Sequence, residues 1–330
     1  MAPLRFGLIG FGHFGKQYVR LLQTMPGASL EAIASHSAGA FEKNQDMLPV
    51  SARVYTHASD VLQNSRIDCV IIATPPSTHH ELIQAALRAG KHVLVEKPMV
   101  QTQKEAEEVR QLAEGGSCIF MVAFQYVYND YINYLRDQLN VHALGKILYV
   151  LSENLYLGPM RSDASCFLDA GSHELSLLEY LFAPGDVSDA RGTHLSFSSA
   201  PSDFTAATIH FDSGLAAHLL TCWFAPEKKH TFTVVGDHGM AVYNDRATSE
   251  KLQFFDRVYP SEKSRGLFST FFTQQTPPWS PSINAREPLQ NELEHFIACV
   301  RTGSRPRTDV EFGYRIMETY EAINTYIQRM

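Results

Sequence analysis

The sequence predicts an α/β protein with two domains of different architecture. A glycine-rich turn at Gly10–Gly15 joins a short apolar segment to a segment with helical spacing. Apolar runs then alternate with amphipathic segments as far as residue 122, which is typical of a parallel sheet covered by helices. Beyond that point, consecutive strand patterns indicate an α+β domain with a large, mainly antiparallel, open-faced sheet. We therefore expect the domains to span residues 1–122 and 123–330.

Length and composition are those of a globular protein. The 330 residues are sufficient for two hydrophobic cores, and 45% hydrophobic with 19% charged residues is not the composition of a disordered chain. The net charge of −7 comes without a block of Lys or Arg, so nucleic acid and anionic membrane surfaces are not expected partners. No apolar run approaches the roughly 20 residues that a membrane-spanning helix needs. Residues 1–5 lack the pattern of a signal peptide.

Cysteine and histidine spacing predicts neither disulfides nor a metal site. The five cysteines are scattered and never spaced as C-x-x-C, so we expect reduced thiols, as in a cytoplasmic protein. His79 and His80 are adjacent in a predicted helix, where neighbouring residues face different directions. Because no third ligand stands at a useful spacing, no bound metal is expected.

The glycine-rich turn follows a strand expected at Leu4–Ile9. Gly10 would make the tight turn, Gly12 would allow a pyrophosphate to approach the backbone, and Gly15 would allow the next helix to pack closely on the strand. The free N–H groups at the helix N-terminus would add a partial positive charge for the phosphates. This context predicts a Rossmann dinucleotide-binding domain, in which the cofactor is held by Gly10, Phe11, Gly12, His13, Phe14 and Gly15.

The second expected strand, Leu30–Ala34, should end on the residue that contacts the adenosine ribose. An NAD-dependent enzyme usually has Asp or Glu there, whereas this chain has Ser35, His36 and Ser37. Without a carboxylate nothing repels a 2′-phosphate, and two hydroxyls with an imidazole could bind one. An ordinary polar loop is the alternative. We expect NADP or NAD as the cofactor, with a preference for NADP.

Two capping boxes are expected at later helix starts. The strand pattern at Asp68–Ala73 leads into Thr74-Pro75-Pro76, and Thr78-His79-His80-Glu81 then has the spacing of a capping box. Thr102-Gln103-Lys104-Glu105 has the same spacing ahead of another amphipathic segment. Both patterns predict that a threonine hydroxyl caps the helix that follows.

The apolar run Val93–Val95 stops abruptly at Glu96, Lys97 and Pro98. Pro98 has no N–H with which to extend a central strand, so Glu96 and Lys97 should lie at the carboxyl end of a strand, where open α/β sheets bind ligands. An exposed ion pair in a surface turn is the alternative for this segment taken alone. A strand at 119–122 should complete the domain.

The second half should form one sheet with helices on one side. Too few helices are expected to cover both faces, so the uncovered face should join subunits in a dimer or tetramer. The expected elements are a helix at Tyr128–Leu139, a strand at Lys146–Leu157, a helix entered through Ser165–Phe182, a hairpin of Phe204–Phe211 with Leu215–Trp223, a loop over 258–287 and two helices around Leu289–Val300 and Phe312–Ile327.

The densest polar stretch of the second half contains Asp169 and His173. They are four residues apart, so a helical turn would place both side chains on one side. A carboxylate beside an imidazole orients the ring and raises its affinity for a proton, which suits a general acid/base near neutral pH. The alternative is a helix-terminal Asp beside a solvated His.

With these motifs in place, the sequence resembles the Gfo/Idh/MocA family, which includes glucose–fructose oxidoreductase, inositol dehydrogenase and rhizopine-catabolism proteins. The resemblance extends over nearly the whole chain, and Glu-Lys-Pro followed by D-x-G-x-H is more specific than the glycine loop. It rests on Gly10–Gly15, Ala73–Pro76 with His79, Gly90–Val93, Glu96–Pro98, Leu144–Ile147, Asp169–His173 and Phe296–Gly303.

The resemblance implies roles for individual residues. Lys97 would point towards the reacting hydroxyl or carbonyl of a sugar or cyclitol, and Asp169 and His173 would complete the catalytic group. Glu96 would lie near the nicotinamide ribose. The resemblance also makes Lys97–Pro98 a candidate cis peptide bond. Beyond the glycine loop and Ser35–Ser37, the expected cofactor-binding residues are Thr74, Pro75, His79, Glu96, Lys97 and Gln125.

Two departures from the family pattern leave the substrate open. The family often has Asp three residues after the histidine, where this chain has Ser176, and a basic residue near Gln125-Tyr126-Val127, where it has none. We expect an NAD(P)-dependent oxidoreductase that acts on a small polyhydroxylated molecule. The alternatives are a regulator that binds dinucleotide without turnover and a glycosidase that uses NAD for transient oxidation.

Overall fold

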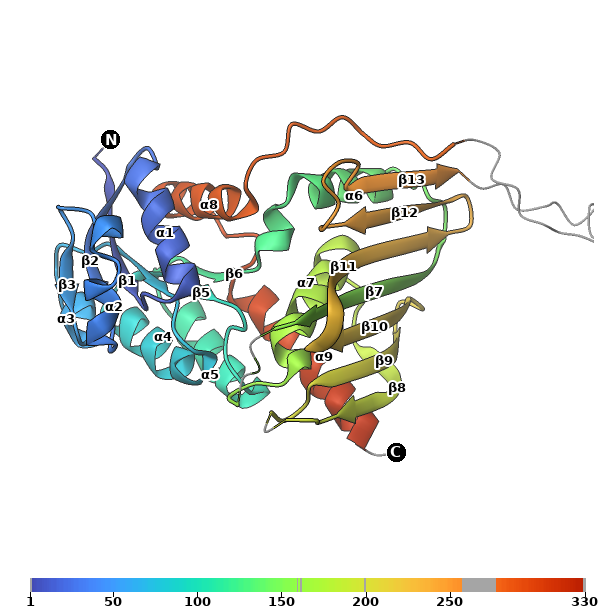
Figure 1. Cartoon of the computed structure of the whole chain (residues 1–330), viewed down its shortest axis with the longest axis horizontal. Helices are drawn as coiled ribbons and strands as arrows, with labels where there is room; N and C mark the ends of the chain where they lie inside the picture. The colour runs from blue at the N-terminus through green and yellow to red at the C-terminus, as the bar shows by residue number, and fades with distance from the viewer. Residues whose placement is uncertain (1, 159, 161, 199, 257–276, 329–330) are drawn as a thin grey trace, which may run out of the picture. The chain divides into compact units, whose positions relative to one another are not determined.

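The computed structural model describes residues 2–158, 160, 162–198, 200–256 and 277–328. Contacts between residues divide the chain into two units, Met1–Gln125 with Glu287–Glu318, and Tyr126–Arg286 with Thr319–Met330 (Figure 1). The sequence pattern places everything after residue 122 in one second domain, whereas here Glu287–Glu318 group with the first unit. Of the loop expected over 258–287, residues 258–276 lie outside the described residues.

The first unit is built on a six-stranded parallel sheet with strand order β3-β2-β1-β4-β5-β6. The chain runs outward from β1 in one direction and then returns to its other side at β4. In sheets of this order, ligands bind outside the carboxyl ends of the strands near that reversal. The strands are β1 (Leu4–Ile9), β2 (Ala28–Ala34), β3 (Arg53–Tyr55), β4 (Cys69–Ile72), β5 (His92–Glu96) and β6 (Phe120–Ala123).

Helices lie on the sheet of the first unit, and its central strands are buried on both faces. Every residue of β4 and β6 is buried, which explains why these strands are continuous apolar runs rather than alternating ones. The helical elements are α1 (His13–Thr24), α2 (Ala38–Glu42), η1 (Gln45–Met47), α3 (Ala58–Leu62), η2 (Pro76–Thr78), α4 (His79–Arg88), α5 (Gln103–Glu114) and α8 (Pro288–Thr302).

The two expected capping boxes have different outcomes. At α5 the box is confirmed, since the Thr102 hydroxyl accepts from the Glu105 N–H and the Glu105 carboxylate accepts from the Thr102 N–H. The box predicted at Thr78 is wrong. A 3-10 turn precedes α4, so Thr78 already has helical backbone angles, and its hydroxyl lies 2.7 Å from Thr74 Oγ1 and 2.8 Å from the Pro75 carbonyl oxygen.

The second unit contains a seven-stranded sheet with strand order β13-β12-β11-β7-β10-β9-β8. β7 pairs in parallel with β10, and the other neighbours are antiparallel, including the expected β9–β10 hairpin. This confirms the predicted fold class. The elements are η3 (Gln125–Tyr128), α6 (Asp130–Asn140), β7 (Ile147–Leu157), η4 (Phe167–Gly171), α7 (Ser172–Phe182), β8 (Val187–Leu195), β9 (Phe204–Phe211), β10 (Ala216–Cys222), β11 (Phe224–Gly236), β12 (Gly239–Asn244) and β13 (Leu252–Asp256). The last helix, α9 (Val310–Gln328), begins in the first unit and ends in the second.

Strand β7 shows that the two faces of this sheet differ. Val150, Ser152 and Asn154 are buried, and the last two contact Glu174 of α7. The alternate residues Tyr149 and Leu151 each remain 40% exposed. Successive strand residues point to opposite faces, so the face that carries Ser152 and Asn154 is covered by α7, and Tyr149 and Leu151 belong to the other face.

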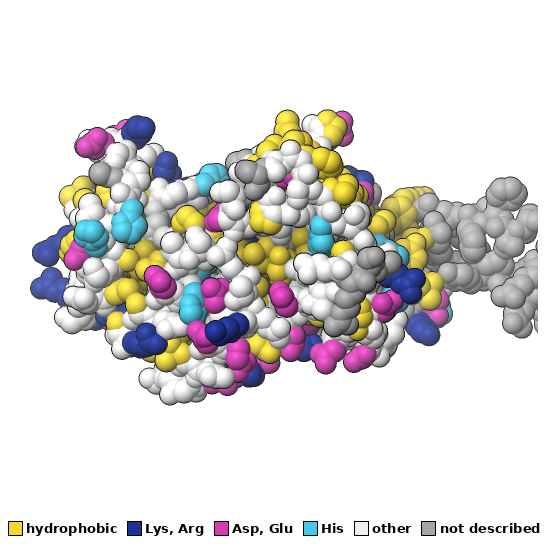
Figure 2. All heavy atoms as spheres, turned by 90° about the horizontal axis from the view of Figure 1, so that it is seen from below, with side chains coloured by type: hydrophobic (Ala, Val, Ile, Leu, Met, Phe, Trp, Pro, Cys, Tyr) yellow, Lys and Arg dark blue, Asp and Glu magenta, His cyan; other side chains and the backbone are white. Residues whose placement is uncertain are grey.

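Charged side chains of both signs are mixed over the surface. On the described part of the face in Figure 2, Lys and Arg are interspersed with Asp and Glu and do not gather into a broad basic patch. A helix both long and apolar enough to cross a bilayer is absent from the described residues.

Candidate functional site

The glycine turn brings the ends of three strands of the first unit together. Gly10 has a φ of +103°, and its N–H donates to the Ala34 carbonyl over 2.8 Å. A Cβ at Gly10 would collide with the Ala73 carbonyl, and one at Gly15 would collide with the Gly10 carbonyl. Both positions therefore require glycine. Gly10 needs it for its positive φ and its close contact with Ala73, and Gly15 needs it so that α1 can approach the end of β1.

Gly12 is constrained differently. A Cβ added there meets nothing within 4 Å, so the residue borders open space rather than packed chain. It stands immediately before α1, whose first turn carries no acidic residue and receives no capping hydrogen bond from the Gly12 position. Free N–H groups and open space together fit the pyrophosphate of a dinucleotide.

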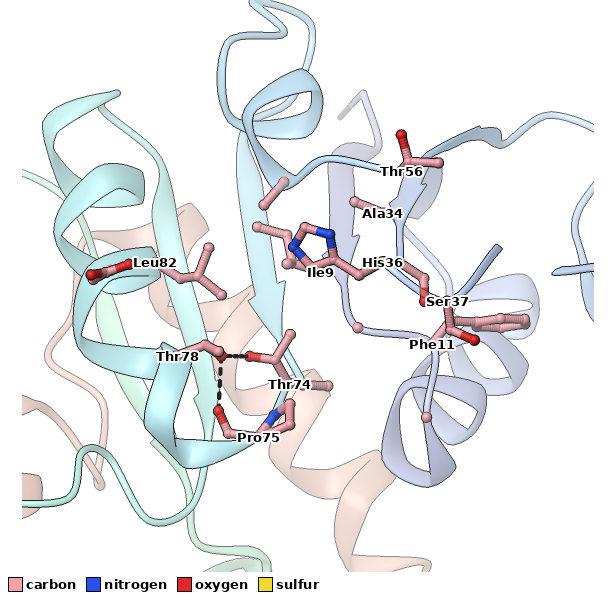
Figure 3. Close-up of a pocket in the computed structure, with 16 residues that line it drawn as sticks. Ile9, Phe11, Ala34, His36, Ser37, Thr56, Thr74, Pro75, Thr78 and Leu82 are labelled. Atoms are coloured by element: carbon pink, nitrogen blue, oxygen red, sulfur yellow. Dashed lines mark hydrogen bonds between the residues drawn. The ribbon is translucent and has the colours of Figure 1, made fainter. Parts of the chain in front are cut away.

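A cavity of about 350 Å³ lies beside this turn, at the carboxyl ends of β1, β2 and β4 (Figure 3). It has the size of a ligand pocket. Helix α4 supplies the opposite wall, including Leu82 and the carboxylate of Glu81. Of the residues predicted to bind cofactor, the cavity is lined by Gly10, Phe11, Gly12, Ser35, His36, Ser37, Thr74 and Pro75.

Histidine His36 extends from the end of β2 into this cavity, towards the side of α4 (Figure 3). Its ring lies edge-to-face with that of His57, with centroids 6.0 Å apart. His57 follows β3 and was not predicted as a site residue, because three-residue β3 has no strong sequence signal and its proximity to His36 depends on the β2–β3 pairing. A second imidazole thus lies against the one that lines the cavity.

His79 lies next to the cavity residues but does not line it. The side chain is 0% exposed, and its Nδ1 and Nε2 atoms lie 2.9 Å from the carbonyl oxygens of Pro98 and Thr74, respectively. Carbonyl oxygens only accept, so the ring can donate to both only when both nitrogens are protonated. His79 connects the segments that follow β4 and β5.

The remaining predicted cofactor residues lie at or beyond strand ends without lining this cavity. Glu96 is the last residue of β5 and is 7% exposed, whereas Lys97 after it is half-buried. The Lys97–Pro98 peptide bond is cis, which confirms that expectation. His13 and Phe14 begin α1, with ring centroids 5.5 Å apart, and Gln125 begins η3 after β6.

In the second unit, Asp169 and His173 occupy a helical stretch that is otherwise inaccessible. Between residues 164 and 178 they are the two half-buried residues, and all the others are buried. Asp169 lies in η4, a π-helical turn, and His173 lies in the first turn of α7. Single π-helical turns are frequent at functional sites. The structure thus places both predicted residues at the accessible edge of one helical segment.

Asp169 is held by two aromatic residues. The Tyr156 hydroxyl donates to Asp169 Oδ2 over 3.2 Å, and the Trp223 indole N–H donates to the Tyr156 oxygen over 2.7 Å. Trp223 is fully buried. Burial and the Asp169 charge raise the pKa of Tyr156, so its hydroxyl remains a hydrogen-bond donor at neutral pH. This chain of donors gives the carboxylate a fixed orientation.

His173 has an aromatic neighbour that connects it to a second histidine. The Tyr126 ring lies edge-on to His173, with centroids 5.0 Å apart, and also to His230, at 4.6 Å. Tyr126 occupies the segment in which the resemblance leads one to expect a basic residue. An aromatic ring lies between His173 and a cationic group instead.

Glu174, directly after His173, is fully buried. Asn154 Nδ2 donates to its Oε1 atom over 3.0 Å, the Ser152 hydroxyl donates to Oε2, and His230 Nε2 lies 3.0 Å from Oε1. A buried carboxylate is stable only when it is paired and hydrogen-bonded. These three partners meet that requirement.

His230 provides the positive charge of this cluster. Burial lowers the pKa of His230, but the Glu174 and Asp245 carboxylates outweigh burial and raise the pKa to about 9. The Nδ1 atom lies 4.0 Å from Asp245 Oδ2, and Tyr243 donates to Asp245 Oδ1 over 2.9 Å. The imidazole is therefore cationic at neutral pH.

Two residues close to His173, Ser176 and Glu174, are buried and face away from the accessible edge. Ser176 is fully buried, and its hydroxyl donates to the His173 carbonyl over 2.6 Å, so this position does not face the accessible edge. Glu174 stood in the polar stretch, but its partners come from β7 and β11. Only the pairing of those strands shows that they meet.

Comparison with known proteins identifies two matching domain families. Residues 4–124 match a family described as "Oxidoreductase family, NAD-binding Rossmann fold", and residues 136–327 match "Oxidoreductase family, C-terminal alpha/beta domain". These are the N- and C-terminal domains of the Gfo/Idh/MocA proteins. Together they cover most of the chain.

Several relatives carry the names of dehydrogenases. An inositol 2-dehydrogenase 2 from Paenarthrobacter aurescens is 29% identical over 187 residues, covering 54% of this chain and 55% of that relative, about half its length. The scyllo-inositol 2-dehydrogenase (NAD(+)) of Bacillus subtilis is 25% identical over 98% of this chain and 94% of its own. Other named relatives include an NADP(+)-dependent enzyme.

A solved structure shares the fold of the whole chain. UDP-N-acetylglucosamine 3-dehydrogenase from Acidithiobacillus ferrooxidans superimposes with a TM-score of 0.83, covering 100% of this chain and 99% of that one, at 21% identity. At this level of identity the likeness concerns the fold alone.

The His230 charge predicts a pH dependence of stability. Because its folded-state pKa of about 9 exceeds the ordinary 6.5, its contribution is complete below pH 6.5 and is lost as the pH rises towards 9. The free energy of unfolding should fall by up to about 3 kcal/mol over that interval. Urea unfolding followed by tryptophan fluorescence measures this, since Trp223 and Trp279 both lie in the second unit.

The matched control is the double variant His230→Asn/Glu174→Gln, which removes both charges of this pair, while Asp245 keeps the Lys251 ammonium 3.6 Å away. It should lose most of this decline between pH 6.5 and 9. An equal decline in both proteins would show that another group titrates.

Proposed function

Because the chain belongs to the Gfo/Idh/MocA oxidoreductase family, we propose that it transfers a hydride between NAD(P) and a secondary alcohol or carbonyl group of a sugar, cyclitol or related polyol. The family assignment confirms the expected NAD-binding oxidoreductase. Support for the substrate class comes from the relatives named for inositol and UDP-N-acetylglucosamine. The observation that carries the proposal is the Asp169–His173 edge, two accessible polar groups in a buried stretch.

His173 would move the hydroxyl proton of the substrate. Asp169, held by Tyr156, would favour the protonated imidazole, and the edge of Tyr126 would limit how the ring turns. The bound nicotinamide supplies the hydride acceptor or donor, and the protein supplies orientation and charge. In this proposal the proton-transfer group, His173, and the cofactor-binding turn, Gly10–Gly15, belong to different parts of the chain.

Lys97 would stabilise negative charge on the reacting oxygen. It directly follows Glu96, the buried last residue of β5. The Lys97 side chain is half-buried, so solvent still reaches part of it. A fixed cation aimed at a developing oxyanion is among the largest catalytic contributions available to a protein. Its neighbour Glu96 would hold the nicotinamide ribose.

The two rival functions have less support. A regulator that binds dinucleotide without turnover has no need of an acid/base pair in addition to the glycine turn. An NAD-assisted glycosidase would share the site, but the relatives described above are named dehydrogenases. Hydrolysis of a chromogenic glycoside without net cofactor turnover would distinguish it from a dehydrogenase.

We propose a preference for NADP over NAD. Ser35, His36 and Ser37 line the cavity at the end of β2, where an NAD enzyme usually places a carboxylate, and His57 adds a second imidazole. Hydroxyl and imidazole groups can donate hydrogen bonds to a 2′-phosphate. Glu81 is the one carboxylate among the residues that line the cavity, and it belongs to α4, on the opposite wall.

We also propose a homodimer or tetramer formed through the uncovered face of the seven-stranded sheet. Tyr149 and Leu151 are half-exposed on that face, and Phe224 of β11 is 40% exposed. Apolar side chains on an open sheet face favour burial against a second copy, and symmetric self-association is the commonest solution.

A cytoplasmic location is proposed from the thiols. All five cysteines are free, and four of them are buried. Unpaired buried thiols are typical of reducing compartments.

Substitution of His173 and Lys97 tests the proposed chemistry. His173→Ala should lower kcat by roughly 10²–10⁴ and leave dinucleotide affinity nearly unchanged, because it removes a general acid/base. Lys97→Met should cause a similar loss, because the oxyanion would lose a fixed charge. Steady-state kinetics on a panel of sugars and inositols, with cofactor titration in parallel, measures both. His238→Ala, whose side chain is 76% exposed, is the control. Full turnover in both variants would contradict the assignment.

Substitution of Gly12 tests the cofactor site separately. Gly12→Val should abolish dinucleotide binding without unfolding the protein, because the branched side chain fills open space that the pyrophosphate would occupy. Gly116→Val, where a Cβ makes only ordinary contacts, is the matched control. Equal cofactor affinity in Gly12→Val and the native protein, measured by calorimetry, would place the cofactor elsewhere.

Cofactor choice should respond to charge at residue 35. NADPH should bind at least as tightly as NADH, and Ser35→Asp should reverse any NADP preference by repelling the 2′-phosphate. Ser35→Asn has a similar shape without the charge and should retain the native preference. Calorimetry that finds a strong NAD preference in the native protein would end this proposal.

Association should depend on the open sheet face. Leu151→Glu should shift the native oligomer towards monomer at micromolar concentration, because a charge would be buried at the interface. Val50→Glu, at a fully exposed position of the first unit, should leave the mass unchanged. Light scattering checks both, and a monomeric native protein would contradict the proposal.

A further inference from the structure

Three buried side chains from distant parts of the sequence meet inside the first unit. Tyr18 of α1 lies with its hydroxyl 2.9 Å from Glu96 Oε1 at the end of β5 and 3.3 Å from Glu292 Oε1 of α8. Tyr18 and Glu292 are 0% exposed, and Glu96 is 7% exposed. Glu292 and Tyr18 belong neither to the cavity nor to the proposed catalytic group.

Counting protons determines the state of this cluster. The Tyr18 hydroxyl has one hydrogen to donate, and the shorter distance assigns it to Glu96. The contact between Tyr18 and Glu292 is then a hydrogen bond only if Glu292 carries the proton and donates to the Tyr18 oxygen. An ionised Glu292 would instead face the lone pairs of a phenol and a second carboxylate.

The surroundings of Glu292 offer no other means of stabilising a charge. Its Oε2 atom has no hydrogen-bond partner, and no Lys, Arg or His lies within ion-pair distance of its carboxyl group among the described residues. An isolated buried carboxylate costs several kcal/mol and takes up a proton instead. Burial and the Glu96 charge both raise the pKa of Glu292 well above its usual range, and burial likewise raises that of Tyr18.

We infer that Glu292 is a neutral carboxylic acid that donates to Tyr18, which donates to Glu96, so that Tyr18 and Glu292 are positioning residues for the carboxylate at the end of β5. This inference rests on the proposed function for its consequence, since Glu96 is proposed to hold the nicotinamide ribose. Helix α8 thereby sets which lone pairs of Glu96 remain to accept from that ribose. The donor chain leaves one negative charge, on Glu96.

Infrared spectroscopy of the native protein tests the protonation state without any ligand. A carbonyl band of a buried carboxylic acid should be present at neutral pH and should be absent in Glu292→Gln. Absence of such a band in the native protein, or its persistence in Glu292→Gln, overturns the inference.

Binding measurements test the positioning role with matched variants. Glu292→Leu should weaken NADH binding by about tenfold, the scale of one hydrogen bond to a charged group, and leave ADP binding unchanged, because ADP lacks the nicotinamide ribose. Glu292→Gln keeps an N–H donor for Tyr18 and should bind NADH nearly as the native protein does. Tyr18→Phe should resemble Glu292→Leu.

The outcomes separate this inference from the function on which it rests. Equal losses of NADH and ADP affinity, or Glu292→Gln as weak as Glu292→Leu, would show that Glu292 serves packing alone and would overturn the positioning role. A native protein that binds ADP but not NADH would contradict the proposed function, whereas the infrared band would still decide the proton on Glu292. If Glu292→Leu does not fold, Tyr18→Phe and Glu292→Gln provide the same comparison.

Discussion

The direction of the chain through the six-stranded sheet is the constraint on which the first unit depends. Because every pairing is parallel, all six strands deliver their carboxyl ends to one edge. Ile9 pairs with Ala34 on one side and with Ile72 on the other, and Ile72 pairs with Val95. A residue needs only to stand one or two positions beyond its strand to join the site. This explains how a glycine turn, a Ser-His-Ser segment, a threonine and a Glu-Lys pair, far apart in the sequence, line one edge.

Both units bury a glutamate completely, and they stabilise it by different means. In the second unit Glu174 lies against the His230 imidazole and accepts from Asn154 and Ser152. In the first unit the Tyr18 hydroxyl is the one hydrogen-bond partner of Glu292 among the residues that the structure describes. A carboxyl group without a cation is more stable with a proton than with a charge. The His230 cation makes the Glu174 pair sensitive to alkaline pH. For Glu292 the question is instead which group donates the hydrogen bond to Tyr18.

Local patterns were sufficient to predict the parts of this protein that are local. The glycine turn and the Thr102 capping box each depend on residues close in sequence, and each was expected from them. The cis Lys97–Pro98 bond was expected from the family resemblance instead. The accessible Asp169–His173 edge also depends on one helical turn. The Thr78 box failed because the preceding 3-10 turn extends the helix backwards, which side-chain spacing does not reveal.

Features that depend on the meeting of distant strands could not be predicted. The sequence shows His230 as one polar residue of a long strand, and only the β7–β11 register places it against Glu174. The proximity of His57 to His36 likewise depends on β3 lying beside β2. The grouping of α8 with the first unit likewise depends on contacts between segments far apart in the sequence.

That grouping has a consequence for how the chain can fold as it is made. The core around β1 includes Phe296 of α8, whose ring lies 6.2 Å from that of Phe6, and the Arg301 guanidinium donates to the Gly27 carbonyl. These partners leave the ribosome only after the whole of β7 to β13. The first unit begins the sequence, but its core therefore cannot be completed early in synthesis. All strands of the seven-stranded sheet are made before the α8 residues that complete this core.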